Sequence, residues 1–244
     1  MSFIAIEQVT KIYRPDGPSS EVTVLRNITS AVAETEFVAL EGPSGSGKTT
    51  LLTIIGAMNR PTGGRVVIDG IDLYGLKEEE LADFRREYIG FVFQQHHLLP
   101  YLTALENVML PLAIVRMPAR EKRVRAAAVL ALVSLGAKAS RLPSELSGGE
   151  QGRVAIARAI VNEPPLILAD EPTGNLDSKT GRDIIECLNS LKDQAHTVVM
   201  VTHNPEASAA ADRVLRIHDG RLVSTESFSV GSQPAQHLLN NSVL

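Results

Sequence analysis

The sequence predicts an α/β fold, with a mostly parallel sheet, packed helices and a helical insertion. Two observations predict this class. A glycine-rich loop, Gly42–Thr49, lies between a short apolar run at 36–41 and an apolar helical run at 48–57, which is a strand–turn–helix pattern. Apolar strands alternating with helical patterns return after residue 165, whereas residues 104–142 show no strand pattern. The two α/β stretches are therefore expected to form one core around an insertion.

The opening third of the chain is rich in strand patterns. Ile4 and Ile6 alternate with polar residues, as do Val22 and Val24, which predicts two half-buried strands. Residues 14–20 between them contain Pro, Gly and Ser and are expected to form a loop.

Four elements are expected between the glycine-rich loop and the insertion. A turn at 61–64 contains Pro and two glycines, and a strand at 65–69 follows it. Residues 77–88 have the charge density of an exposed helix, and 89–93 form another apolar strand pattern. These elements extend the α/β core up to the insertion.

The insertion is expected to contain one long helix. Good helix formers are dense from Ala119 to Leu135, and Gly136 is placed to end the helix. Strand patterns resume at 166–169 and 197–201.

Composition limits the possible functions. The 244 residues suffice for one large domain or a core with a subdomain, and a hydrophobic fraction of 44% supports a real core. A formal net charge of -4 argues against non-specific nucleic-acid binding, so no nucleic-acid partner is expected. Cys187 is the only cysteine, which excludes an internal disulfide and favours a small apolar residue in a reducing compartment.

No membrane signal is expected in the chain itself. Residues 1–7 lack the basic and apolar regions of a signal peptide, and the longest apolar run, 126–135, is too short for a membrane span. Ser2 stands where myristoylation needs glycine, and residues 241–244 contain no prenylation cysteine. We expect a soluble, cytoplasmic chain unless another subunit carries it to a membrane, with 225–244 as a peripheral tail.

The glycine-rich loop predicts a nucleoside triphosphate site. Residues 42–49 fit the pattern G-x-x-x-x-G-K-[ST] without a mismatch. Glycines let successive N–H groups point at phosphate oxygens, and the helix N-terminus adds its positive dipole end. Lys48 would reach the β- and γ-phosphates, and Thr49 would hold Mg²⁺.

A second set of polar residues follows the insertion. Leu146–Glu150 contains Ser-Gly-Gly before a helical run, which is either an anion-binding terminus or an ordinary N-cap. Asp170 ends an apolar strand and is placed to bind Mg²⁺ directly or through water, and Glu171 to take a proton from the attacking water or orient it. His203 follows another buried strand, where a structural histidine is the alternative to a catalytic one.

Together these residues resemble the nucleotide-binding subunit of an ABC (ATP-binding cassette) transporter, over roughly residues 3–224. The motifs that match in order and spacing are the phosphate loop Gly42–Thr49, Gln94, the signature Leu146–Glu150, Asp170 with Glu171, Asp177 and His203. The resemblance implies the ABC ATPase fold: a single domain with a P-loop NTPase core, an N-terminal antiparallel β subdomain and an inserted α-helical subdomain at about 95–145.

The resemblance also implies ATP hydrolysis, with ATP and Mg²⁺ as cofactors. It implies a head-to-tail homodimer in which each ATP lies between the phosphate loop of one subunit and the signature of the other. Catalytic roles would fall to Glu171, His203 and Gln94, and magnesium would be held by Thr49, Gln94 and Asp170. The residues expected at the nucleotide are Tyr13, Gly42, Pro43, Ser44, Gly45, Ser46, Gly47, Lys48, Thr49, Thr50, Ser147, Gly148, Gly149 and Asp177.

Several residues keep two interpretations. Tyr13 falls where the family places an aromatic that stacks on adenine, but a core aromatic is the alternative. His96 and His97 would point to opposite faces of an extended segment, which disfavours a metal site. The basic stretch from Arg116 to Arg125 is a solvated helix face or a docking surface for acidic lipid or a partner.

Two residues depart from the family pattern. Glu150 stands where many cassettes have Gln, although some subfamilies carry Glu there. Gly152 replaces a more usual polar residue in the first turn of the signature helix. A glycine inside a helix costs about 1 kcal/mol relative to Ala, so we expect a looser helix that keeps its anion site.

Residues 90–108 and 168–177 resemble the lipoprotein-releasing and macrolide-export branch of the family. That branch implies membrane-spanning permease subunits that dock through a coupling helix near Gln94–Leu105, with a periplasmic adaptor reached through the permease. The chain would then lie at the cytoplasmic face of the inner membrane. The apolar run Leu98–Leu102 is either contact surface for that helix or packing beneath the insertion.

Three functions stay open. The first is the ATPase motor of a lipoprotein-release or macrolide-type exporter. The second is a regulatory cassette that signals through a membrane partner to cell-wall enzymes. The third, a soluble ABC ATPase of DNA repair or translation, is disfavoured because such proteins usually need a coiled-coil insertion or two cassettes in one chain.

Overall fold

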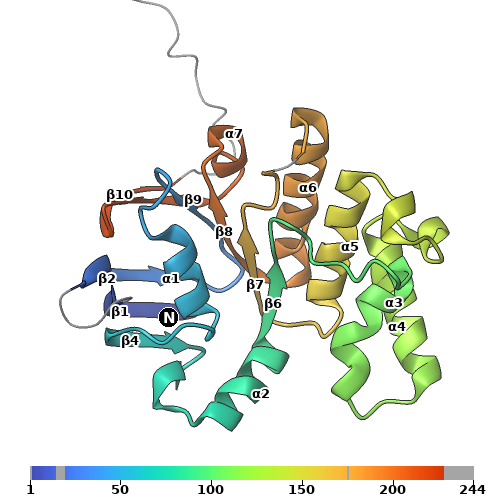
Figure 1. The fold of residues 1–244 in the computed structure, drawn as a ribbon, viewed down its shortest axis with the longest axis horizontal. Helices are drawn as coiled ribbons and strands as arrows, with labels where there is room; N and C mark the ends of the chain where they lie inside the picture. Colours follow the sequence, from blue (N-terminus) through green and yellow to red (C-terminus); the bar gives the residue numbers. More distant parts are fainter. Residues whose placement is uncertain (1, 15–19, 175, 228–244) are drawn as a thin grey trace, which may run out of the picture.

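The computed structural model describes residues 2–14, 20–174 and 176–227, and confirms the predicted α/β class. Figure 1 places a small β layer at one end of the molecule and a helical segment at the other, with the main sheet between them. Among the described residues, no helix has both the length and the apolar character needed to cross a membrane.

The main sheet has six strands in the order β10-β9-β3-β8-β7-β6. All neighbouring pairs are parallel except β9 with β10. The strands are β3 (Phe37–Glu41), β6 (Ile89–Val92), β7 (Leu166–Asp170), β8 (Thr197–Thr202), β9 (Arg213–His218) and β10 (Arg221–Ser227). The parallel strands end at one edge of the sheet, so the loops that follow them gather there.

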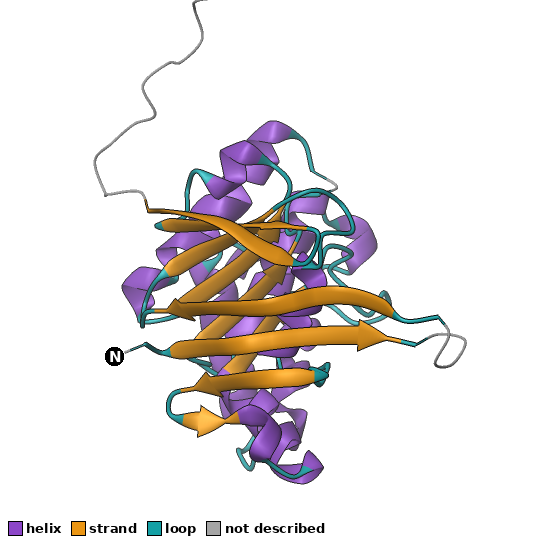
Figure 2. Cartoon of the chain, turned by 90° about the vertical axis from the view of Figure 1, so that its left-hand side faces the viewer, coloured by secondary structure: helices purple, strands orange, loops and turns teal. Residues whose placement is uncertain are grey.

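The N-terminal sheet is antiparallel, as the family resemblance implies, with the order β2-β1-β4-β5. Figure 2 shows its strands stacked below those of the main sheet. Its strands are β1 (Ile4–Tyr13), β2 (Val22–Val32), β4 (Gly63–Ile68) and β5 (Ile71–Asp72). Helix α1 (Lys48–Ile55) shares one buried apolar cluster with this sheet and with one face of the main sheet.

The other face of the main sheet supports the helices. Strand β8 displays the two-sided arrangement: Val199 and Val201 lie in the cluster with α1, whereas Val198 and Met200 lie in the cluster with the helical segment. Because both faces are covered, β8 is buried along its whole length. The helices on this face are α3 (Ala104–Met109), α4 (Ala119–Leu132), α5 (Gly148–Ile160), α6 (Ser178–Ser190) and α7 (Pro205–Ser208). Helix α2 (Glu78–Tyr88) packs instead in the cluster with α1, through Leu81 and Phe84.

The long helix of the insertion is shorter than predicted. It ends at Leu132 instead of continuing to Leu135. Ser134 adopts a left-handed conformation with φ 61°, and the Leu135 N–H donates to the Leu130 carbonyl at 2.8 Å. This left-handed turn ends the helix before Gly136 and returns the buried Leu135 to the core.

The hairpin of β9 and β10 is absent from the sequence-based prediction. Strand β10 reaches Ser227, three residues past the expected domain boundary at 224, and its outward residues alternate with partly buried ones. The remainder of the expected tail, 228–244, lies outside the described residues.

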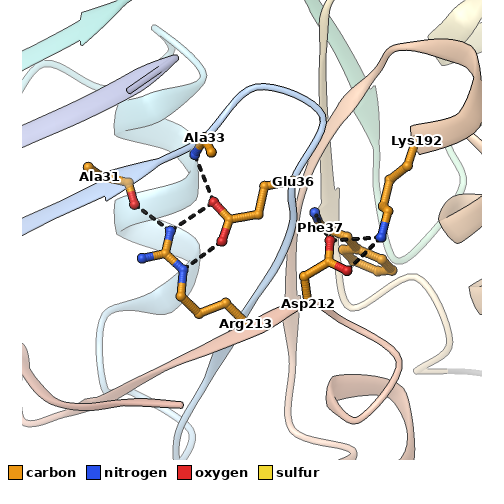
Figure 3. Close-up of polar contacts among 7 residues, drawn as sticks. All are labelled: Ala31, Ala33, Glu36, Phe37, Lys192, Asp212 and Arg213. Atoms are coloured by element: carbon orange, nitrogen blue, oxygen red, sulfur yellow. Dashed lines mark hydrogen bonds and ion pairs between the residues drawn. The ribbon is translucent and has the colours of Figure 1, made fainter. Parts of the chain in front are cut away.

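One partly buried ion pair and one hydrogen bond hold the start of β9 and the start of β3 together, and a second ion pair joins Asp212 to Lys192 (Figure 3). Arg213 donates to both carboxylate oxygens of Glu36, at 2.7 and 2.9 Å, and to the carbonyl of Ala31. Asp212 accepts from the Phe37 N–H at 2.8 Å and from Lys192 at 2.6 and 2.8 Å. Arg213 therefore links the antiparallel sheet, through Ala31 on β2, to the main sheet.

Replacing Arg213 by Met should lower the free energy of unfolding by about 2 kcal/mol, because it leaves Glu36 partly buried and unpaired. Arg65→Met is the matched control: its ion pair with Asp72, at 2.9 Å, has side chains that are 53% and 37% exposed, against 20% and 14% for Arg213 and Glu36. That exposed pair should contribute less than about 1 kcal/mol. Urea denaturation of both variants would test the link, and equal losses would contradict it.

Candidate functional site

Four neighbouring parallel strands bring the predicted polar segments together. The phosphate loop follows β3, His203 follows β8, Glu171 follows β7 and Gln94 follows β6. An open cavity of about 670 Å³ lies where these segments meet. It is lined by Val24, Ser44, Gly45, Gly47, Lys48, Thr49, Thr50, Gln94, Glu171 and His203.

The phosphate loop turns tightly between β3 and α1. Gly47, the residue before the helix, has φ 102°, and a Cβ there would lie 2.7 Å from Leu25 Cδ2 and 2.9 Å from the Val24 carbonyl oxygen. Glycine satisfies both the left-handed conformation and the close contact with β2. The loop thus aims the N-terminus of α1 and its free N–H groups at the cavity.

Two side chains of the loop are buried and polar. Lys48 is 7% exposed, and its ammonium donates to the carbonyls of Gly42 and Pro43 at 2.8 and 2.9 Å. Ser46 Oγ is buried and has no hydrogen-bond partner in the described part of the protein. A buried ammonium and an unsatisfied hydroxyl beside a helix N-terminus fit an anionic ligand such as a phosphate.

Thr49, which lines the cavity, contacts Asp170 at the end of β7. The Thr49 hydroxyl donates to Asp170 Oδ1 at 3.0 Å. Burial raises the pKa of Asp170, and the neighbouring Glu171 raises it further, while the hydrogen bond from Thr49 opposes both effects. A hydroxyl and a carboxylate fit Mg²⁺, which takes few protein oxygens when substrate phosphates complete its shell. Elsewhere, as here, the described residues contain no cluster of three or more His, Cys, Asp or Glu that could hold a metal.

Glu171 and His203 form a hydrogen-bonded pair. Glu171 Oε2 lies 2.9 Å from His203 Nδ1 and 3.4 Å from the backbone nitrogen of His203. Glu171 has φ 47°, a left-handed conformation that a non-glycine residue adopts at a cost, and its N–H donates to the Val201 carbonyl at 3.0 Å. The carboxyl is 16% exposed and the imidazole 68% exposed. This geometry directs a carboxylate into the cavity with a histidine at its open side.

Gln94 is exposed and lines the same cavity. A Cβ on Gly174 would lie 2.7 Å from Gln94 Nε2, so the amide rests against the loop that follows Glu171.

Two residues that fix the Gln94 loop escaped the sequence analysis. Arg158, on α5, donates to the carbonyls of His96 and His97 at 2.5 and 2.6 Å. Asn107, on α3, is fully buried, and its amide bonds the backbone of Leu99, Leu102 and Thr103. Only the fold reveals the role of Arg158, because its partners lie 61 and 62 residues earlier in the chain. Asn107, in contrast, bonds backbone groups four to eight residues before it.

Tyr13 lies outside the set that lines the cavity. It ends β1, its ring is 40% exposed, and its hydroxyl accepts a hydrogen bond from Asn59 at 2.6 Å. Lys11 Nζ lies 4.9 Å from the ring centroid. The exposure excludes the alternative of a core aromatic, and a cation already occupies one face of the ring.

The signature and Asp177 do not reach the cavity within one chain. Ser147 caps α5, accepting from the Glu150 N–H at 3.3 Å, and Gly148 is exposed beside it. Asp177 caps α6 by accepting from the N–H groups of Lys179 and Thr180. Of the described residues that line the cavity, none comes from these two motifs. Asn175 lies outside the described residues.

Gly152 has a packing role in the structure. It is buried in α5, and a Cβ there would lie 3.0 Å from Ile184 Cδ1 and 3.4 Å from His96 Cε1. His96 and His97 have φ 55° and 47°, so their segment is turned and not extended as predicted, and His96 is buried against α5. Helix α5 continues through Gly152 without a break.

Comparisons with known proteins agree with this geometry. The sequence model of a family described as ABC transporter matches residues 25–174. An uncharacterized ABC transporter ATP-binding protein of Thermotoga maritima is 49% identical over 222 residues, which are 91% of this chain and 94% of the relative. The macrolide export ATP-binding/permease protein MacB of Brucella melitensis is 47% identical over 221 residues, and the chain spans only about a third (34%) of that relative.

The fold of this chain is also similar to that of a solved ATP-binding cassette. A dimeric structure of the ATP-binding cassette MJ0796, in a post-hydrolysis state bound to ADP and Pi, has a TM-score of 0.83 and 44% identity. The similarity covers 92% of this chain and 98% of that chain.

Replacing Gly152 by Gln should lower the free energy of unfolding by about 1–3 kcal/mol, because the longer side chain must displace Ile184 or His96. In a His96→Ala background the same change should cost less, since the imidazole no longer occupies the space. Urea denaturation of the four proteins in this double-mutant cycle measures the coupling, and strictly additive costs would refute the packing role.

Proposed function

Because this chain belongs to the ABC transporter family and is an ABC ATPase cassette, we propose that it is the ATP-hydrolysing motor of an exporter of the lipoprotein-release or macrolide-export type. The proposal of ATP hydrolysis depends on one observation: Glu171 is hydrogen-bonded to His203 close to the contact between Thr49 and Asp170. ATP would bind with its phosphates on the N-terminus of α1.

The residues of the loop would bind and orient the triphosphate. Lys48 would exchange its bonds to the Gly42 and Pro43 carbonyls for bonds to the β- and γ-phosphates. Thr49 and Asp170 would hold Mg²⁺, which when bound offsets charge on the phosphate oxygens. Tyr13 would stack on adenine through the ring face opposite Lys11.

Hydrolysis would require a positioned water. Glu171 would accept a hydrogen bond and then a proton from that water as its oxygen attacks the γ-phosphorus and the bond to ADP breaks. His203, which already holds Glu171 Oε2, would fix the carboxylate and contact the γ-phosphate from the open side. Gln94, whose amide lies beside Gly174 in the loop after Glu171, would contact Mg²⁺ and orient the attacking water.

The complete site would be shared between two copies of the chain. The signature Ser147, Gly148 and Gly149 forms a second helix N-terminus that does not reach the cavity of its own chain. The cassette MJ0796, which has the same fold, is dimeric in its solved structures. In a head-to-tail homodimer each signature would face the γ-phosphate bound by the opposite phosphate loop, with Asp177 beside the interface.

A groove beside the Gln94 loop would receive the coupling helix of a permease. Two adjoining cavities, of about 550 and 460 Å³, share Arg86, Ile114 and Asn162. Their described lining includes stacked Phe91 and Phe93, and Ile114 is 70% exposed. The run Leu98–Leu102 is divided: Leu98 packs against the core, whereas Tyr101 is 72% exposed.

The charge of this groove favours an acidic partner segment. Its described lining carries the five arginines Arg85, Arg86, Arg116, Arg125 and Arg158 and one carboxylate, Glu87. Arg86 pairs with Asp83 and Glu87, and Arg125 with Glu163, so the excess positive charge comes from Arg85, Arg116 and Arg158. The basic stretch of the insertion thus borders the groove. A coupling helix with carboxylates beside an apolar face would complement it, and would hold the chain at the cytoplasmic face of the membrane.

The branch assignment is supported by the relatives called macrolide export ATP-binding/permease proteins, at 46–47% identity in several species. In these relatives the matching part is about a third of a longer protein that is also named a permease. We propose membrane-spanning permease subunits as the partners of this cassette, with a periplasmic adaptor reached through them. A regulatory cassette acting on cell-wall enzymes is the second candidate, and a permease that co-purifies without an adaptor would favour it.

Glu171→Gln should bind Mg-ATP and accumulate as an ATP-bound dimer, with turnover reduced about 100-fold or more, because the amide keeps the size of the side chain but cannot take a proton. Sedimentation with ATP and a phosphate-release assay measure the two effects. Adding Lys48→Ala should abolish dimer formation by weakening ATP binding. Near-normal hydrolysis in Glu171→Gln would exclude Glu171 as the main base.

Ile114→Glu should weaken binding to the co-purifying permease by about tenfold or more, because it removes an apolar contact and places a carboxylate against the acidic segment. Val124→Glu is the matched control, since Val124 is 63% exposed and lies outside the lining of the groove. Both variants should retain ATP binding. Co-sedimentation with permease-containing membranes measures the difference, and equal retention of the two variants would contradict this docking surface.

A further inference from the structure

The first turn of α5 contains an ionised side chain beside the signature. Ser147 and Glu150 form a reciprocal capping box: Ser147 Oγ accepts from the Glu150 N–H at 3.3 Å, and Glu150 Oε2 accepts from the Ser147 N–H at 3.0 Å. The second oxygen of the carboxylate, Oε1, accepts from Lys138 Nζ. Glu150 therefore uses one oxygen to cap the helix and the other to bind a cation.

Lys138 is fixed in place by its own backbone. It ends the short 3₁₀ turn Gly136–Lys138, its N–H donates to the Leu135 carbonyl at 2.9 Å, and its carbonyl accepts from the Arg141 N–H at 3.0 Å. The Glu150 side chain is only 16% exposed, whereas that of Lys138 is 46% exposed. The hydrogen bond from Lys138, followed by that from the Ser147 backbone, lowers the pKa of Glu150. The carboxylate is thus ionised at neutral pH, with a cation beside it.

This arrangement resolves an electrostatic conflict. The N–H groups in the first turn of a helix attract an anion. A carboxylate in the same turn repels a second anion, and the repulsion is substantial over a few ångströms near a partly buried site. A glutamine in this place would complete the capping box without charge. With glutamate, a neighbouring cation is needed to keep the signature attractive to phosphate.

We propose that Lys138 is a positioning residue of the shared site, which neutralises Glu150 so that the start of α5 accepts the γ-phosphate of ATP held by a second copy of the chain. This inference rests on the shared site of the proposed function. Lys138 contacts no substrate in this scheme and acts through Glu150.

The neighbouring ion pair between Arg141 and Glu145 provides a matched control. Glu145 likewise caps a short turn by accepting from the Leu142 N–H, and Arg141 donates to it at 3.0 Å. Both side chains of this pair are more exposed than Glu150, at 57% and 43%. The pair lies before the signature and does not contact Ser147 or Glu150 in the described structure.

The test uses the full chain with Glu171→Gln, in which dimers accumulate with Mg-ATP. Adding Lys138→Ala should raise the dissociation constant of the ATP-bound dimer about tenfold, as expected for one uncompensated charge near phosphate. Affinity of the monomer for ATP should change less than about twofold, because its own phosphate loop is intact. Lys138→Arg should retain most of the dimer, and Arg141→Ala should leave its dissociation constant within about twofold.

The variant Glu150→Gln distinguishes two roles of Lys138: neutralising the Glu150 carboxylate, or only supporting the fold of the turn. In a chain that carries Glu150→Gln, adding Lys138→Ala should shift the dimer constant less than about twofold, because no carboxylate remains to be neutralised. If Lys138→Ala weakened the dimer equally with and without Glu150→Gln, Lys138 would have a folding role, and the proposal would be overturned. An unchanged dimer constant in Lys138→Ala would also overturn it while leaving the shared site standing. Failure of the Glu171→Gln parent to dimerise with ATP would refute the shared site itself, and this inference with it.

Discussion

The parallel pairing of β8 between β3 and β7 is the constraint on which the site depends. Glu41 pairs with Thr202 and Asp170 with Val201, so the phosphate loop, His203 and the acid pair begin at the same level of the sheet. A one-residue slip of β8 would reverse its two faces, exchanging the side chains that contact α1 with those that contact the helical segment. The two apolar clusters therefore fix the register, and the register positions the groups that we propose as catalytic.

Local sequence motifs were sufficient to predict most of the segments that meet at the carboxyl ends of the parallel strands. The phosphate loop, the acid pair after β7 and the histidine after β8 each combine an apolar strand with polar residues at its end, and the fold brings these segments together as expected. The hairpin of β9 and β10 was missed because its hydrophobic pattern is weak: four of the seven β10 residues are exposed and none is fully buried. Its position depends on contacts far apart in sequence, such as Arg213 with Glu36. No local pattern reports such contacts.

Contacts between separate elements also explain why Gly152 and Glu150, the two departures from the family pattern, are accommodated in the structure. Gly152 suggested a loosened helix, but the structure uses the missing side chain as space for His96 and Ile184. Glu150 places a negative charge in the signature, where many cassettes have Gln, but Lys138, twelve residues earlier, donates a hydrogen bond to its carboxylate. In both cases the residue is unusual at its position in the helix, and a side chain from another element compensates for it by packing or by an ion pair. A propensity scale, which treats each helix alone, misses that compensation.

Helix α5 joins the two halves of the proposed mechanism. It begins at Ser147, where the nucleotide of a second chain would dock, and about 17 Å farther along its Arg158 holds the carbonyls of His96 and His97. The loop so held begins with Gln94 and borders the arginine-lined groove. Because α5 is a continuous helix packed into a buried cluster, a displacement at its start would move the loop at its other end. In the proposed dimer, engagement of ATP by the signature and movement of the permease groove would therefore be coupled through one rigid element.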